Sequence, residues 1–125
     1  MDYLLVFAGG GIGAALRHWV NGLSLALFGP DYPWGTLFIN VSGSLLMGVV
    51  VELAALRIGM PAHVRLFIAT GILGGYTTFS TFSLEAALLH SRGDTALAVG
   101  YALGSLVLGV AGFFAGMHGV RALSA

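Results

Sequence analysis

The chain has 125 residues, of which 58% are hydrophobic and only 8% are charged, and its formal net charge is zero. Because charged residues make up about 25% of an ordinary soluble domain, this composition excludes that class and favours an all-α membrane protein. The zero net charge gives no reason to expect nucleic acid as a partner, and the absence of cysteine excludes disulfides and thiolate chemistry.

Four apolar stretches fill almost the whole chain, and each is long enough to cross about 30 Å of hydrocarbon. They cover about residues 3–28, 34–56, 62–90 and 95–117. Residues 1–125 are therefore predicted to form one four-span domain among the lipids of the cell inner (plasma) membrane. Asp2 stands where a signal peptide would carry a basic region, so we expect the first stretch to remain as a span. The sequence offers no nucleophile–base set or metal-ligand spacing, and we expect no enzymatic activity.

Polar residues interrupt the first two spans. In the first, Gly9 and Gly13 form a small-xxx-small pair typical of close helix packing, and Arg17 lies well inside the apolar region. A buried arginine usually faces the bundle interior or a water cavity, and snorkelling to an interface explains it equally well. In the second, Thr36 and Asn40 share a helix face at i, i+4. We expect Asn40 to bond inside the bundle, either for a purely structural purpose or as part of a pathway.

The third span is predicted to be broken in its middle. The segment from Gly74 to Thr78 combines two glycines with two β-branched threonines, and all four are poor helix formers. Phe79 and Phe82 follow, three residues apart, and share one face once the helix resumes. Hydroxyls crowd this segment, at Thr77, Thr78, Ser80, Thr81 and Ser83. A kinked helix whose hydroxyls bond to its own carbonyls is the alternative, but five hydroxyls beside a break favour a polar site.

The last span carries a glycine seam and a short polar stripe. The seam, which predicts close helix packing, consists of Gly100, Gly104, Gly109, Gly112 and Gly116. Tyr101 and Ser105 form the stripe at i, i+4, and both a structural and a functional role are open for them.

The distribution of arginines bears on orientation. The termini share a membrane side with the loop from Arg57 to Arg65, and this side also carries Arg121, whereas the other side carries only Arg92. Three arginines against one favour cytoplasmic termini, but the excess is small enough to let both orientations insert. Glu52, near the far end of the second span, is expected to reach water.

Backbone groups freed by a break in hydrocarbon must find partners or line a wet cavity. Two copies in an antiparallel pair would bring their breaks together at the midplane, around a two-fold axis in the membrane plane. Four carbonyl oxygens converging there suit a small hard cation such as sodium. The side chains nearby suit a small anion instead, because they offer neutral hydrogen-bond donors and the positive edges of phenyl rings.

Three segments resemble the CrcB/Fluc family of fluoride channels. They read GGGIGAALR from Gly9 to Arg17, GTLFINVSG from Gly35 to Gly43, and GGYTTFSTFS from Gly74 to Ser83. The third segment is highly specific, and the resemblance covers all four spans in order. It implies a passive exporter that relieves fluoride toxicity in the cytoplasm and works as a dual-topology antiparallel homodimer with two pores.

The residues expected along the fluoride pathway, from the pattern and the resemblance together, are Thr36, Asn40, Phe79, Ser80, Thr81, Phe82, Tyr101 and Ser105. The resemblance also implies that Arg17 stands near a pore vestibule. It further implies that the carbonyl oxygens of Gly74 and Thr77 hold a structural sodium ion at the dimer interface. The sequence departs from the family at Gly109, where some members have a hydroxyl, and at Tyr76, where Phe or Leu is commoner.

The strongest rival is a small multidrug-resistance-type exporter, which is proton-coupled and is also a four-span antiparallel dimer. Such exporters depend on a carboxylate within the first span, and here that span has Arg17 and no acid beyond Asp2. A membrane assembly subunit without transport activity is the other alternative.

Overall fold

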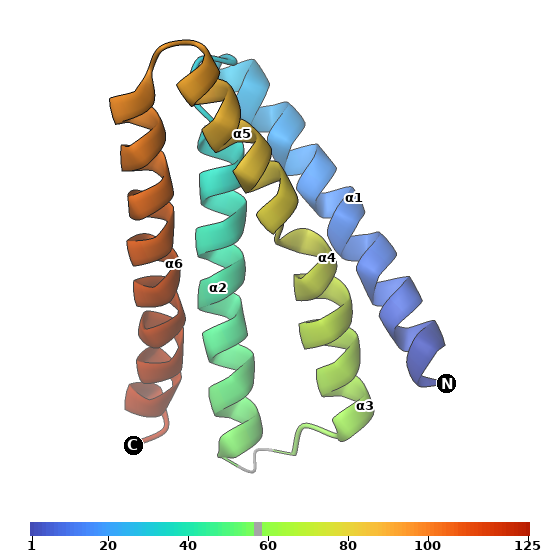
Figure 1. The fold of residues 1–125 in the computed structure, drawn as a ribbon. Helices are drawn as coiled ribbons and strands as arrows, with labels where there is room; N and C mark the ends of the chain where they lie inside the picture. The colour runs from blue at the N-terminus through green and yellow to red at the C-terminus, as the bar shows by residue number, and fades with distance from the viewer. Residues whose placement is uncertain (57–58) are drawn as a thin grey trace.

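Helices account for every regular element that the structure, a computed structural model, describes in residues 1–56 and 59–125 (Figure 1). In chain order they are α1 (Asp2–Phe28), α2 (Trp34–Ala55), α3 (Ala62–Arg65), the π-helical η1 (Leu66–Leu73), α4 (Gly74–Tyr76), α5 (Phe79–Ser91) and α6 (Thr95–Leu123). The all-α prediction is confirmed, and the last helix runs six residues beyond the predicted end at residue 117. Arg57, which begins the predicted second loop, lies outside the described residues.

The helices pack in two pairs. α2 lies against α6 along its length, and α1 lies against η1 and α4 (Figure 1). α5 continues the third segment at a different angle and packs on α6. Both chain ends lie at the same end of the bundle as α3, and the turn between α5 and α6 lies at the opposite end (Figure 1).

The contact between α1 and the third segment is close enough to require glycine. A Cβ atom built on Gly13 would overlap the carbonyl oxygen of Ile72, and one built on Gly9 would lie 2.6 Å from the carbonyl oxygen of Phe67. Both glycines are buried. The predicted small-xxx-small pair is therefore confirmed, and it fits α1 against η1.

The glycine seam on α6 serves helix packing only in its second half. A Cβ atom on Gly116 would overlap the Leu45 carbonyl oxygen of α2, whereas one on Gly100 or Gly104 would meet nothing within 4 Å. Among the described residues of one chain, the prediction of close packing is therefore confirmed for Gly112 and Gly116 and not for Gly100 and Gly104. Sixteen residues of α-helix turn about 160° more than four full turns, so Gly100 and Gly116 lie on opposite faces of α6.

The third segment breaks at Thr77 and Thr78, whose ψ angles of 157° and 124° are those of extended backbone. The predicted break is confirmed, but Gly74 and Gly75, which were assigned to it, are still helical in α4. Gly75 serves a different purpose, because a Cβ atom there would overlap the carbonyl oxygen of Gly10 in α1. The glycines thus bring α1 close, and the threonines make the break.

Glu52 does not reach water as expected, because its residue is only 5% exposed. Its two carboxylate oxygens accept hydrogen bonds from Nε and Nη2 of Arg121, at 3.0 and 3.1 Å. This bidentate ion pair joins the C-terminal ends of α2 and α6. The long α6 makes it possible, since Arg121 lies beyond the predicted end of that helix.

Two of the helices, α2 and α6, are long and apolar enough to cross a membrane. Many large apolar side chains point outward, and on α6 both Leu106 and Val107 are 63% exposed. An exposed apolar surface of this kind indicates contact with lipid or with another protein chain. The two long apolar helices and this surface agree with the membrane protein that the composition predicts.

We expect Gly13→Ala to destabilise the fold by about 1–3 kcal/mol, because its methyl group would push α1 away from Ile72. Gly22→Ala is the matched control in the same helix, since a Cβ atom there meets nothing within 4 Å. Thermal unfolding of the purified protein in detergent measures both. An equal loss of stability in the two variants would contradict the close contact.

Candidate functional site

The two extended residues at the break terminate the helices on either side. Thr77 closes α4, because its backbone turns extended after its N–H and its hydroxyl have both donated to the carbonyl oxygen of Leu73, at 3.0 and 2.9 Å. Thr78 is the N-cap of α5, because its hydroxyl accepts from the N–H of Thr81 at 3.2 Å. The hydroxyl of Ser83 bonds to a carbonyl oxygen one turn earlier. The alternative of hydroxyls bonded within their own helix is thus correct for Thr77 and Ser83.

Asn40 holds the backbone of the break from the side of α2. Its Nδ2 donates to the carbonyl oxygen of Thr78 at 2.9 Å, and its Oδ1 accepts from the N–H of Thr78 at 2.8 Å. This pair of bonds satisfies both polar groups of one extended residue. The side-chain amide of Asn40 has two N–H groups and uses one of them in this pair, so one donor remains for another partner.

Arg17 meets the break from the side of α1. Its Nε donates to the carbonyl oxygen of Gly75 at 3.1 Å. A cation suits this place, because the last carbonyl groups of a helix lack partners and carry partial negative charge. Arg17 therefore faces the bundle interior and does not snorkel to an interface. Its terminal nitrogens remain available to solvent or another ligand.

A groove of about 400 Å³ opens on the surface of the chain beside the break. It is lined by Asn40, Gly43, Ser44, Met47, Thr77, Thr78, Phe79, Phe82, Ser105, Leu106, Gly109 and Phe113. The rings of Phe79 and Phe82 have centroids 5.6 Å apart, and Phe79 is 79% exposed. The Oγ atom of Ser105 is buried and has no hydrogen-bond partner in the described residues. The groove thus combines two phenyl rings with a hydroxyl that has no partner among the described residues.

Glu85 joins two of the predicted site residues. Its Oε1 accepts from the Thr36 hydroxyl at 2.9 Å, and its Oε2 accepts from the Tyr101 hydroxyl at 3.0 Å. Tyr101 also lies against Phe82, with ring centroids 5.2 Å apart, so the cluster adjoins the groove. Sequence reasoning missed this role of Glu85. The signal was its spacing, because Glu85 follows Phe82 by three residues and shares its helix face.

Ser80 and Thr81 do not line the groove of the single chain. Ser80 is exposed, and its hydroxyl lies 3.5 Å from that of Thr78. Thr81 is partly buried and contributes its backbone N–H to the cap of α5. Their place in a polar track stays a prediction, and it requires a surface that this chain alone does not enclose.

Gly74 precedes the break and Thr77 forms part of it. Within residues 1–56 and 59–125, neither carbonyl oxygen accepts a hydrogen bond. The N–H that would reach Gly74 in a continuous helix, that of Thr78, bonds to Asn40 instead, and the N–H that would reach Thr77, that of Thr81, bonds to the Thr78 hydroxyl. Hard carbonyl oxygens without partners are the ligands that sodium prefers. These two atoms fit the expected cation, although one chain supplies only part of a coordination shell.

Residues 4–117 match the family described as CrcB-like protein, Camphor Resistance (CrcB). The chain belongs to this family. The "Fluoride-specific ion channel FluC" of Rhodopseudomonas palustris (strain BisB5) is 56% identical over 124 residues, which cover 99% of this chain and 100% of the relative. "Fluoride-specific ion channel FluC 2" of Nitrobacter hamburgensis is 54% identical, with the same coverage of both chains. A "Fluoride-specific ion channel FluC" of Granulibacter bethesdensis is 52% identical over 98% of this chain and 97% of the relative.

The CrcB family is the one that the three sequence motifs indicate, so the resemblance is confirmed. These comparisons do not favour the multidrug-type exporter. They cover the groove, the break and the Glu85 cluster together, since the matched residues run through all of these elements.

We expect Asn40→Ala to cost about 1–3 kcal/mol of stability for a backbone group left unpaired at Thr78. Hydrogen exchange at the Thr78 N–H should accelerate in the same variant, because its acceptor is gone. Ser44→Ala is the control, since Ser44 lines the same groove one turn further along α2. Unchanged exchange at Thr78 would show that the amide is not its main partner.

Proposed function

We propose that this CrcB-family protein is a fluoride-selective channel that passively carries fluoride out of the cytoplasm and so relieves fluoride toxicity. Relatives at 52–56% identity over nearly the full chain are named fluoride-specific ion channels, and this observation supports the choice of ion. The proposal assigns the chain no enzymatic activity.

The groove forms one part of the pathway, and the donors there are neutral. The buried Ser105 hydroxyl, the second N–H of Asn40 and the ring edges of Phe79 and Phe82 would face the ion. A small anion passing such weak donors is bound without being trapped, and conduction requires that balance. The unpartnered Ser105 hydroxyl is the structural observation that supports this mechanism most directly.

Thr36 and Tyr101 take part in a different way from the one expected. Each hydroxyl has one hydrogen, and both hydrogens point at Glu85. A fluoride ion at this cluster would compete with the carboxylate for them, so each hydroxyl would rotate between Glu85 and the ion. The competition keeps the binding weak at the Glu85 end of the path.

The working unit is proposed to be an antiparallel homodimer in which each chain spans the cell inner membrane four times. A single chain leaves its groove and Phe79 uncovered, and a second copy is the partner that would close them. In this arrangement the carbonyl oxygens of Gly74 and Thr77 from both chains would hold a sodium ion on the two-fold axis. Arg17 would face the vestibule beside the break, and Ser80 and Thr81 would complete the polar track between the chains.

Liposomes that contain the protein should release internal fluoride, and a fluoride electrode measures the rate. We expect Phe79→Ile and Phe82→Ile each to lower this rate about threefold to tenfold, because isoleucine has no positive ring edge to offer the ion. Phe38→Ile is the matched control, since Phe38 points outward from α2 and lies apart from the groove.

Two outcomes would overturn the proposal. Parent protein that releases no fluoride but takes up cationic drugs against a proton gradient is a multidrug-type exporter. Parent protein that moves neither solute is an assembly subunit.

Sodium removal tests the proposed cation. Protein purified and reconstituted with N-methylglucamine in place of sodium should lose most of its fluoride release and much of its dimer, and added sodium should restore both. Protein kept in sodium throughout is the control. A dimer that stays intact and active without sodium would remove the ion from the proposal while leaving the fluoride pathway standing.

A further inference from the structure

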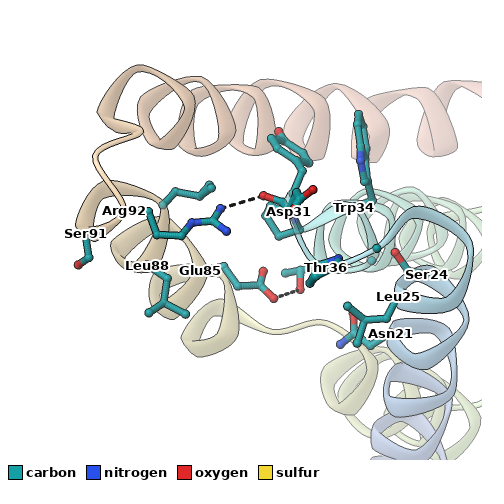
Figure 2. Close-up of a pocket in the computed structure, with 16 residues that line it drawn as sticks. Asn21, Ser24, Leu25, Asp31, Trp34, Thr36, Glu85, Leu88, Ser91 and Arg92 are labelled. Atoms are coloured by element: carbon teal, nitrogen blue, oxygen red, sulfur yellow. Dashed lines mark hydrogen bonds between the residues drawn. The ribbon is translucent and has the colours of Figure 1, made fainter.

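A second cavity, of about 490 Å³, lies at the end of the bundle that carries the α5–α6 turn. The end of α1, the loop at residues 29–33, the start of α2 and the last turns of α5 surround it (Figure 2). It shares no lining residue with the groove. The two are nevertheless joined, because Phe82 of the groove lies against Tyr101, whose hydroxyl donates to Glu85 in the cavity wall.

Three charged side chains line this cavity, two of them acidic and one basic: Asp31, Glu85 and Arg92. Figure 2 shows the Glu85–Thr36 hydrogen bond on one side, and Arg92 reaching across the other side toward Asp31. Burial raises the pKa of the Tyr32 hydroxyl, the remaining acid of the wall, so Tyr32 stays neutral. Arg92 is thus the one cation against two carboxylates.

The positive charge of Arg92 is not spent on an ion pair. Its Nη2 donates to the backbone carbonyl oxygen of Asp31 at 2.8 Å, and across the described ranges the one salt bridge is between Arg121 and Glu52. The backbone bond holds the guanidinium over the cavity while its charge remains available. Without Arg92, an anion that approached Glu85 would meet the two carboxylates of the cavity wall and no cation.

We propose that this cavity is an outer mouth of the pore and that Arg92 is the side chain that admits the anion there. The inference rests on the proposed fluoride conduction. Arg92 raises the local concentration of fluoride at the cavity and offsets the repulsion from Asp31 and Glu85. The ion then reaches the hydroxyls of Thr36 and Tyr101, and beyond them the groove. Fields of this kind act on the rate of ion entry and weaken as salt concentration rises.

The absence of cysteine from the chain permits a direct test of charge at this position. Arg92→Cys is purified, reconstituted in planar bilayers, and treated on both sides with a trimethylammonium or a sulfonate methanethiosulfonate reagent. We expect the unmodified variant to carry about threefold to tenfold less fluoride current than the parent at low ionic strength. The cationic adduct should recover most of the current, the anionic adduct should reduce it further, and the difference should shrink in high salt.

Three further variants complete the experiment. Arg65→Cys, exposed and at the opposite end of the bundle, should respond alike to both reagents. Arg92→Lys, which keeps the charge, should conduct like the parent, whereas Arg92→Gln, which removes it, should not. This pair serves if Arg92→Cys does not fold. Equal currents for the two adducts of Arg92→Cys, or a loss in Arg92→Lys as large as in Arg92→Gln, would overturn the inference. Parent protein without fluoride current would instead overturn the proposed function itself.

Discussion

The double hydrogen bond between Asn40 and Thr78 is the interaction on which the rest of the site depends. An apolar surrounding offers no water to a broken helix, so both polar groups of the extended residue need partners within the protein. Asn40 supplies them from α2, at 2.9 and 2.8 Å. Because Thr78 is also the N-cap of α5, this pair of hydrogen bonds sets where α5 begins and therefore where Phe79 and Phe82 lie.

The arrangement separates two kinds of polar group along the proposed path. Around the groove, the buried Ser105 hydroxyl and the remaining amide hydrogen of Asn40 are donors that have no fixed acceptor among the described residues. Around Glu85, the hydroxyl hydrogens of Thr36 and Tyr101 already have one. A carboxylate beside an anion path is tolerable for this reason, since two donated hydrogen bonds disperse part of its charge.

Much of the fold could be predicted from sequence because apolar length and turn residues are local signals. The helices at residues 2–28, 34–55 and 95–123 and the break in the third segment follow from them. What local signals do not contain is the partner of each residue. From sequence, Gly75 is predicted to break the helix, but in the structure it allows close contact with Gly10 of α1. Glu52 is predicted to reach water, but in the structure it accepts hydrogen bonds from Arg121.

The site shows the same division. Asn40, Thr36 and Tyr101 could be chosen from sequence, because polar groups in apolar helices are costly and need a reason. Their bonds could not, since Glu85 and Thr78 lie 49 and 38 residues away along the chain from Thr36 and Asn40. Tyr76 is a small example: its departure from the commoner Phe or Leu gains meaning only from the 3.0 Å contact between its hydroxyl and that of Ser42.

The bonds that Arg17 and Asn40 make to the break have a consequence for biosynthesis. Both are formed within one polypeptide, so a newly inserted copy has already covered most of its interrupted backbone before it encounters a second. Such a copy can diffuse in the bilayer as a folded intermediate, because the backbone groups at its break already have partners within the chain. Assembly of the proposed dimer is then an encounter between two folded chains, and its speed depends on how many copies each membrane holds.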